Sequence, residues 1–112
     1  MEVRASGRNI MASSKEYLSF VLDQLSGLNE ITYRAMMGEY ILYYRGKIIG
    51  GIYDDRLLVK PVMAAKRLMP DAVLEIPYDG AKEMLLVEDV DDREFLSGLV
   101  EAMYDELPER RK

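Results

Sequence analysis

Three residue types are missing from this 112-residue sequence, which contains no histidine, no cysteine and no tryptophan. Without histidine and cysteine there can be no Ser-His-Asp triad and no Cys-His nucleophile pair. The same absences exclude disulfides, iron–sulfur clusters and zinc sites with His or Cys ligands. Catalysis would have to use carboxylates, lysine, arginine, tyrosine or hydroxyl groups, so the composition favours a function other than catalysis.

Long apolar runs are missing as well. No stretch of about 18 apolar residues, the length needed to span a membrane, occurs in the sequence. Residues 1–10 lack the apolar core of a secretory signal, so we expect a cytoplasmic protein that does not bind membranes. A composition of 49% hydrophobic and 31% charged residues is typical of one folded domain. We expect that domain at 13–108, between a flexible extension, 1–12, and a frayed tail, 109–112.

The charge is distributed unevenly along the chain, whose net charge is −5. Residues 31–70 carry seven basic and three acidic side chains, whereas residues 71–94 carry nine acidic and two basic ones. The negative total argues against general nucleic-acid affinity, because phosphates repel an acidic protein. The basic middle segment can still form a local positive surface.

The spacing of apolar residues predicts an α+β domain in the order α-β-β-β-β-α-β-β-α. Capping-box patterns begin a first helix at about 14–27 and, from Asp91 to Glu94, a last helix that ends at Pro108. Between them the pattern predicts a four-strand meander, a short helix and one or two later strands. The segments are 31–37, 40–45, 47–53 and 56–60 for the meander, 62–69 for the helix, and 73–76 and 83–87 for the later strands. We expect two layers, with the helices packed on one face of an antiparallel sheet.

Strand alternation predicts which residues share a face of this sheet. With two-residue turns at Arg45-Gly46 and Asp54-Asp55, one face carries no charge and should lie under the long helices. That face holds Ile41, Tyr43, Ile48, Gly50, Ile52, Leu57 and Val59. The other face is mixed, and holds Tyr40, Leu42, Tyr44, Lys47, Ile49, Gly51, Tyr53, Arg56, Leu58 and Lys60. A β-bulge at Gly50-Gly51 would reverse the alternation locally.

The mixed face is the candidate partner surface. An apolar centre surrounded by tyrosine and basic residues is typical of protein interfaces. The candidate residues are Tyr40, Leu42, Tyr44, Lys47, Ile49, Tyr53, Arg56, Leu58 and Lys60. The partner could be another protein or a second copy of the chain. Two alternatives stay open: residues 71–88 could cover this face, or its tyrosines and basic groups could bind a small ligand or single-stranded nucleic acid.

No pattern in the sequence indicates a catalytic, cofactor or metal site, and we expect none. Asp54-Asp55 fits a turn better than an acid–base pair. Asp89, Asp91 and Asp92 resemble the start of a calcium loop, but Arg and Glu follow where a ligand and a glycine belong. Helix capping and the helix dipole explain these acidic residues. Gly46-Lys47 lacks the upstream glycine of a P-loop.

Two further runs of the sequence resemble a known family. They are Tyr33-Arg34-x-Met36-Met37-Gly38-x-Tyr40-x-Leu42-Tyr43-x-x-Gly46-Lys47 and Asp54-x-Arg56-Leu57-Leu58-Val59-Lys60. This pattern is similar to the N-terminal domain of the TfoX/Sxy family, bacterial regulators of natural competence, over about residues 14–107. The matching motif positions are Arg34, Met36, Met37, Gly38, Tyr40, Tyr43 and Gly46.

The resemblance implies an α+β domain with an antiparallel sheet, no enzyme activity and no cofactor. It implies a regulatory or adaptor domain that acts through protein contacts, in transcription or competence control, with a homodimer as one form. Glu39 and Ile41 stand where the family often has glycine, and Met37 replaces its usual phenylalanine. Full-length competence regulators also carry a C-terminal helical domain, which this sequence lacks, so we expect a stand-alone TfoX-like domain.

Overall fold

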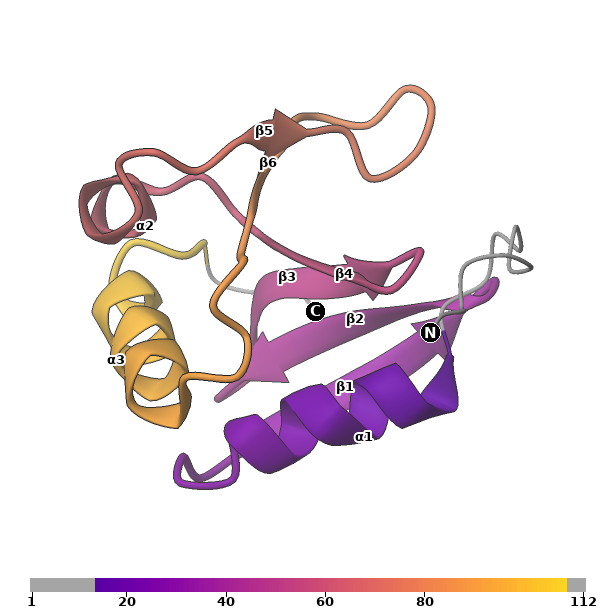
Figure 1. The fold of residues 1–112 in the computed structure, drawn as a ribbon, viewed down its shortest axis with the longest axis horizontal. Helices are drawn as coiled ribbons and strands as arrows, with labels where there is room; N and C mark the ends of the chain where they lie inside the picture. The colour runs from indigo at the N-terminus through magenta and orange to yellow at the C-terminus, as the bar shows by residue number, and fades with distance from the viewer. Residues whose placement is uncertain (1–13, 109–112) are drawn as a thin grey trace.

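A computed structural model describes residues 14–108, so the predictions for residues 1–12 and 109–112 lie outside the described residues. The predicted order α-β-β-β-β-α-β-β-α is confirmed (Figure 1). The elements are α1 (Lys15–Gln24), β1 (Ile31–Met36), β2 (Glu39–Tyr44), β3 (Lys47–Tyr53), β4 (Arg56–Val59), α2 (Met63–Leu68), β5 (Leu74–Glu75), β6 (Met84–Leu86) and α3 (Arg93–Tyr104).

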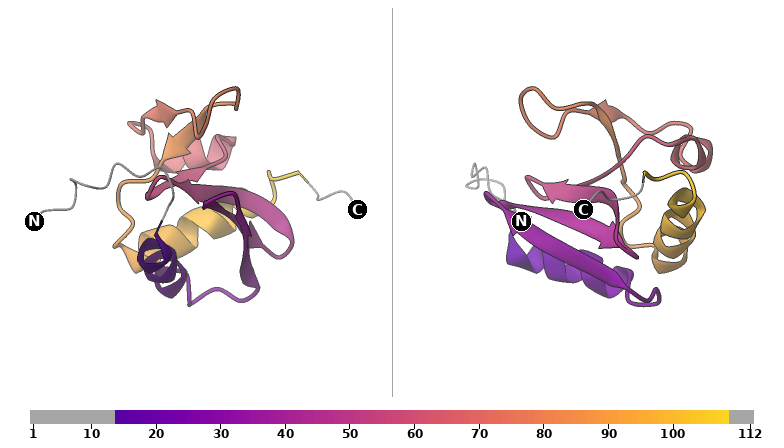
Figure 2. Two further views of the ribbon diagram at one scale, coloured as in Figure 1. Left: turned by 90° about the vertical axis from the view of Figure 1, so that its right-hand side faces the viewer. Right: turned by 180° about the vertical axis from the view of Figure 1, so that it is seen from behind.

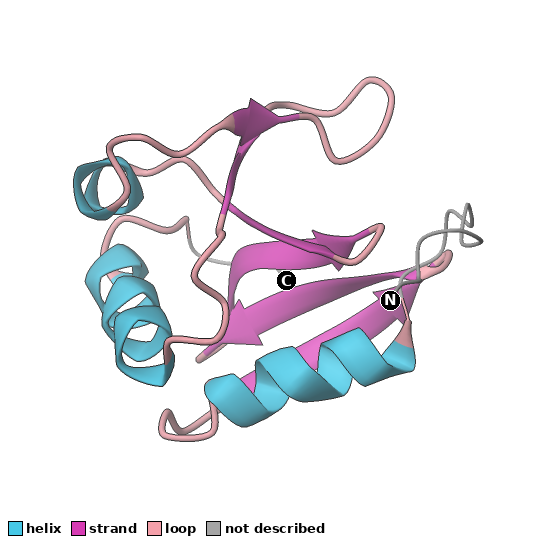
Figure 3. Ribbon diagram, viewed as in Figure 1, coloured by secondary structure: helices cyan, strands magenta, loops and turns pink. Residues whose placement is uncertain are grey.

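The six strands form one antiparallel sheet in the order β1-β2-β3-β4-β6-β5, so β1 and β5 are its edges (Figure 3). Viewed from behind, the meander lies in front of α1, which shows the two layers (Figure 2). Helix α3 contacts α1, α2 and β3. The α+β class and the antiparallel sheet are therefore confirmed. None of the helices between residues 14 and 108 is long and apolar enough to cross a membrane.

Side-chain caps set where the two long helices begin. Ser14 Oγ accepts a hydrogen bond from Tyr17 N at 3.1 Å, and Asp92 Oδ1 accepts one from Phe95 N at 3.0 Å. Such a cap typically stabilises a helix by about 1 kcal/mol. Both helices begin within a residue or two of the predicted patterns. Ser14 N also donates to Asp55 Oδ1 at 2.8 Å, which joins the start of α1 to the β3–β4 turn.

Two-residue turns join the first four strands. The two central residues of each turn have positive φ: Met37 and Gly38, Arg45 and Gly46, and Asp54 and Asp55. This is the type I′ geometry, whose twist matches that of the flanking strands. The predicted turns at Arg45-Gly46 and Asp54-Asp55 are confirmed, and the latter pairs Tyr53 with Arg56.

A β-bulge in β3 changes the predicted faces. Tyr43 pairs with Ile48, but Leu42 pairs with Gly50, so Ile49 is an extra residue in β3. The predicted alternation is therefore wrong for β2 and the start of β3, and right for the end of β3 and for β4. Gly50 is required here, because a Cβ would overlap the carbonyl oxygen of Leu58 and lie 2.7 Å from Val59 Cα.

The core lies between the sheet and the helices. Gln24 is its buried polar residue, and its Nε2 donates to Val90 O at 3.1 Å, which gives the buried amide a hydrogen-bond partner. The buried apolar residues of the core are Leu18, Val21, Leu25, Leu42, Tyr44, Ile49, Ile52, Leu57, Val59, Ala65, Leu85, Val87, Leu96, Leu99, Val100, Met103 and Leu107. The bulge thus places both Ile49 and Ile52 on the helix side, although their separation in the sequence is odd.

Candidate partner-binding groove

A groove runs along the sheet face opposite α1, and we call it the sheet groove. Its cavity has a volume of about 600 Å³. Strands β1, β2 and β3 supply the floor: Arg34, Met36, Ile41, Tyr43, Ile48 and Tyr53. The segment around the β5–β6 loop supplies one wall: Pro77, Tyr78, Ala81, Lys82, Glu83 and Met84. Lys60, Pro61, Val62, Glu106 and Pro108 complete the lining.

Register explains why these floor residues share one face. Arg34 pairs with Ile41, and Tyr43 pairs with Ile48, so both pairs project to the same side of the sheet. Ile41 and Ile48 are partly exposed, and Met36 is 46% exposed. Apart from Arg34 at its border, the floor is therefore an apolar surface that is open along β1 and closed along β4.

Tyr53 forms the closed side of the groove. Its ring lies over Gly51, where a Cβ would come within 2.8 Å of ring carbons. It also packs against the Tyr78 ring, with 6.1 Å between centroids and 52° between ring planes. Burial, with smaller contributions from Tyr78 and Glu39, raises the pKa of Tyr53 to about 12. The phenol is therefore neutral at physiological pH and can donate a hydrogen bond.

A charged cluster stands beside Tyr53. Arg56 Nε donates to Tyr53 O at 3.0 Å, and its guanidinium forms an ion pair with Glu75. Burial raises the pKa of Glu39, an effect that Arg56 opposes and Asp54 reinforces. Arg56 thus joins the β3–β4 turn to β5 and holds the groove wall in place.

The opposite end of the groove is closed by the segment after α3. Glu106 Oε1 accepts a hydrogen bond from Ala64 N at 2.8 Å. The N-cap of α2 is Val62, which has no side-chain acceptor, so Glu106 satisfies an amide that the cap residue cannot. This contact holds the segment after α3 against the start of α2, and Val62, Glu106 and Pro108 all line the groove.

Three basic side chains border the groove: Arg34, Lys60 and Lys82. Within residues 14–108, none of the three side chains makes a hydrogen bond or ion pair. Glu83 is the exposed acidic residue of the lining, and Glu106 is used by the α2 amide. The rim therefore carries more positive than negative charge, in a protein whose net charge is −5.

Most of the predicted partner surface lies elsewhere. Leu42, Tyr44 and Ile49 are buried under the helices, so their prediction as surface residues is wrong. Tyr40 packs against the same core, and its ring contacts the Tyr33 ring edge-on, with 5.9 Å between the ring centroids. The single extra residue of the β3 bulge moved all of these side chains to the helix side.

Lys47 is also on the helix side, contrary to prediction. Its Nζ donates to Tyr104 O at 3.1 Å and lies 4.1 Å from the centroid of the Tyr104 ring. It therefore stabilises the end of α3 by a charge-assisted hydrogen bond and a cation–π contact. Its role in this structure is to hold a helix rather than to meet a partner.

The remaining predicted residues do lie on the groove side of the sheet. Tyr53 and Lys60 line the groove. Leu58 pairs with Gly51 and is fully buried, and Arg56 is engaged with Glu75. The alternation missed the groove residues Ile41, Tyr43 and Ile48, which it assigned to the helix-covered face. The Gly50-Gly51 pair was the one signal that could have corrected it.

The predicted family-motif residues divide among the groove, the turns and, for Tyr40 alone, the helix side of the sheet. Arg34, Met36 and Tyr43 line the groove. Three others form turns with positive φ, namely Met37, Gly38 and Gly46. The motif therefore specifies the hairpins of the meander as well as part of the groove floor.

The acidic segment does not cover this face. Residues 74–75 and 84–86 extend the sheet beyond β4, and the loop between them projects outward (Figure 1). Residues of this loop line the groove as its wall. The hypothesis that residues 71–88 bury the open face is therefore wrong for Met36, Ile41 and Ile48, which keep exposed surface. It is right in part near β4, where Tyr78 packs on Tyr53 and where Leu58, paired with Leu86 of β6, is fully buried.

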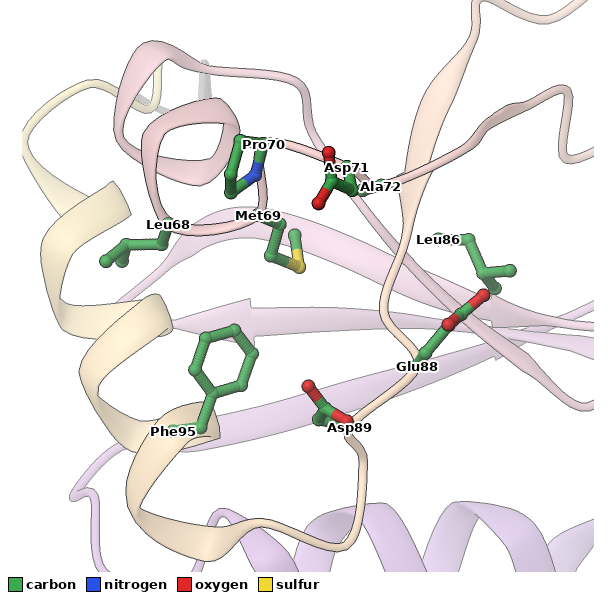
Figure 4. Close-up of a pocket in the computed structure, with 9 residues that line it drawn as sticks. All are labelled: Leu68, Met69, Pro70, Asp71, Ala72, Leu86, Glu88, Asp89 and Phe95. Carbon is green, nitrogen blue, oxygen red and sulfur yellow. The ribbon is translucent and has the colours of Figure 1, made fainter.

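A second, smaller hollow of about 220 Å³ lies between α2 and the start of α3. The side chains of Met69 and Phe95 point toward one another across it, and Glu88 and Asp89 border it (Figure 4). Despite these carboxylates, the part of the chain that the structure describes holds no group of three or more residues arranged to bind a metal ion. The sheet groove is the larger and more apolar of the two, so we take it as the candidate site.

Comparisons with known proteins agree with the resemblance seen in the sequence. The TfoX N-terminal domain family matches residues 23–106. A protein of Spirochaeta aurantia, described as an uncharacterized 12.7 kDa protein in the trpE 5′ region, is 35% identical over 80 residues, which cover 71% of this chain and 70% of that protein. No solved structure matches. The chain belongs to the TfoX N-terminal domain family.

Proposed function

We propose that this protein is a non-enzymatic, cytoplasmic regulatory domain that binds a protein partner in the sheet groove. Membership of the TfoX N-terminal domain family supports a regulatory role of the competence or transcription type. The observation that carries the proposal is the open apolar floor of Met36, Ile41 and Ile48. Apolar floors with a polar, charged rim are typical of sites that receive a few anchoring side chains of a partner.

The rim indicates the chemistry of this partner. Arg34, Lys60 and Lys82 have no partner within the described chain, so acidic groups beside the docked segment would meet them. Complementary charge of this kind mainly speeds association and selects partners. We therefore expect a protein segment with apolar anchor side chains flanked by Asp or Glu.

The nucleic-acid alternative has less support from the geometry. Stacking of bases needs exposed aromatic faces, but Tyr43 and Tyr53 are only 7% and 5% exposed. Among the groove tyrosines, Tyr78 alone offers a large exposed surface, at 55%. One accessible ring and an apolar floor suit a protein segment better than a strand of bases.

Affinity capture with matched variants tests the proposal. Wild type, Met36→Glu, Ile48→Glu and the control Phe20→Glu serve as baits, with and without nuclease treatment of the lysate. Phe20 is 39% exposed, close to the 46% of Met36, but it lies on α1, away from the groove. Thermal unfolding checks that every bait is folded.

We expect proteins captured by wild type and Phe20→Glu, resistant to nuclease, and lost with Met36→Glu and Ile48→Glu. Equal capture by all four baits would contradict a partner site in the groove. Loss of capture after nuclease treatment would support the nucleic-acid alternative instead.

A further inference from the structure

The free edge of the sheet at β1 offers a second interaction surface. Residues 32–36 are exposed, and Tyr33 and Met36 are 49% and 46% exposed. Natural edge strands are usually protected by lysine, proline, a bulge or very short length. β1 is six residues long, its register with β2 is unbroken, and its only charged residue is Arg34.

The hydrogen-bond phase shows which backbone groups this edge presents. Arg45 N donates to Glu30 O at 3.0 Å, in the same register that pairs Met36 with Glu39 across the turn. In an antiparallel ladder, alternate residues point their N–H and C=O groups to opposite sides. Residues 30, 32, 34 and 36 therefore bond to β2, while Ile31, Tyr33 and Ala35 direct theirs away from the sheet.

We propose that two copies of the chain pair through their β1 strands, antiparallel, about a two-fold axis at Tyr33. In this register Tyr33 faces Tyr33 of the second copy, and Ile31 faces Ala35 of the second copy. All outward N–H and C=O groups of these three residues then find partners, with two hydrogen bonds in each facing pair. Such pairing of identical patches is the isologous contact expected of a two-fold dimer.

Charge and geometry disfavour the neighbouring registers. An axis at Arg34 would set two guanidinium groups directly opposite each other, and like charges there are destabilising. An axis at Thr32 would leave Ala35 outside the ladder, because its partner would be residue 29, beyond the strand. With the axis at Tyr33, Arg34 faces the neutral Thr32 of the second copy.

The two-fold axis is perpendicular to the sheet, so both sheet grooves open on the same side of the dimer. Each floor begins at β1, with Arg34 and Met36. Thr32 and Arg34 of both copies lie on this side next to the axis, so the pair would present two apolar floors separated by a polar, positively charged strip. A partner with two matching segments would gain avidity from this arrangement.

Single cysteines test the register directly, because the native chain has none. Facing residues in a hydrogen-bonded pair have Cα atoms about 5.5 Å apart, within the range of a disulfide. Residues that do not face their own copy lie farther apart. Thr32→Cys, Tyr33→Cys and Arg34→Cys are compared under mild oxidation, beside sedimentation of the wild type over a wide concentration range.

We expect a concentration-dependent dimer and cross-linking that is strongest with Tyr33→Cys. Tyr33→Pro removes an outward N–H without removing a bond to β2, so it should raise the dimer dissociation constant at least about tenfold while the domain stays folded. A wild type that is monomeric at every concentration would overturn the proposal. Preferential cross-linking by Thr32→Cys or Arg34→Cys would overturn the register.

Discussion

Replacing Gly50 by alanine should destabilise the domain strongly, because the β3 bulge leaves no room for a side chain. The new Cβ would overlap Leu58 O and approach Val59 Cα to 2.7 Å, and both atoms belong to the backbone of β4. A flexible side chain could move aside, but a paired strand must shift as a whole. Adding a methyl group to a tightly packed site costs about 1–3 kcal/mol. We expect a loss at the upper end of this range, about 3 kcal/mol, from a free energy of unfolding that is near 5–15 kcal/mol for domains of this kind.

Urea unfolding followed by circular dichroism measures this loss. Gly98→Ala is the matched control, since Gly98 lies in α3 and a Cβ there meets nothing within 4 Å. Alanine favours helix by about 0.5–1 kcal/mol over glycine, so this control should be slightly more stable than wild type. A Gly50→Ala protein as stable as wild type would refute the bulge, and with it the placement of Tyr43 and Ile48 on the groove face.

Three other contacts give shorter predictions. Asp92→Ala removes the cap of α3 and should cost about 1 kcal/mol in urea unfolding, whereas Asp92→Asn should cost much less; equal losses would argue against the cap. Lys47→Met keeps the aliphatic stem but loses the hydrogen bond to Tyr104 O, and should lower the free energy of unfolding by about 1–2 kcal/mol. An unchanged free energy of unfolding would show that this contact does not stabilise the domain. Because the pKa of Tyr53 is raised to about 12, its contribution to stability is complete below pH 10 and declines between pH 10 and 12. The free energy of unfolding should therefore fall less steeply with pH in this range for Tyr53→Phe than for wild type. Identical slopes for the two proteins would contradict the raised pKa.

Local patterns in the sequence predicted the order of elements. Helix starts at Ser14 and Asp92 and turns at Arg45-Gly46 and Asp54-Asp55 follow from short-range chemistry, so the pattern locates them within a residue or two. The unbulged ladder between β3 and β4 was also predicted correctly. These features depend on residues that are neighbours in the chain.

The residues of the sheet groove could not be predicted from strand alternation. One extra residue, Ile49, reversed the faces of β2, so Leu42 and Tyr44 entered the core and Ile41 and Tyr43 left it. The aliphatic and tyrosine residues of β2 suit either face equally well, so composition could not correct the error. The groove walls also come from residues 77–84 and 106–108, which are distant in sequence from the floor.

The contact between Glu106 and Ala64 has a thermodynamic consequence. Helix α2 has only six residues and no side-chain acceptor at its own N-cap, so part of its free energy of folding comes from a carboxylate beyond the end of α3. The order of residues 106–108 and the formation of α2 are therefore linked equilibria. If an occupant of the groove favours the ordered position of Pro108, it also stabilises α2, and by reciprocity a change that destabilises α2 weakens the binding of that occupant.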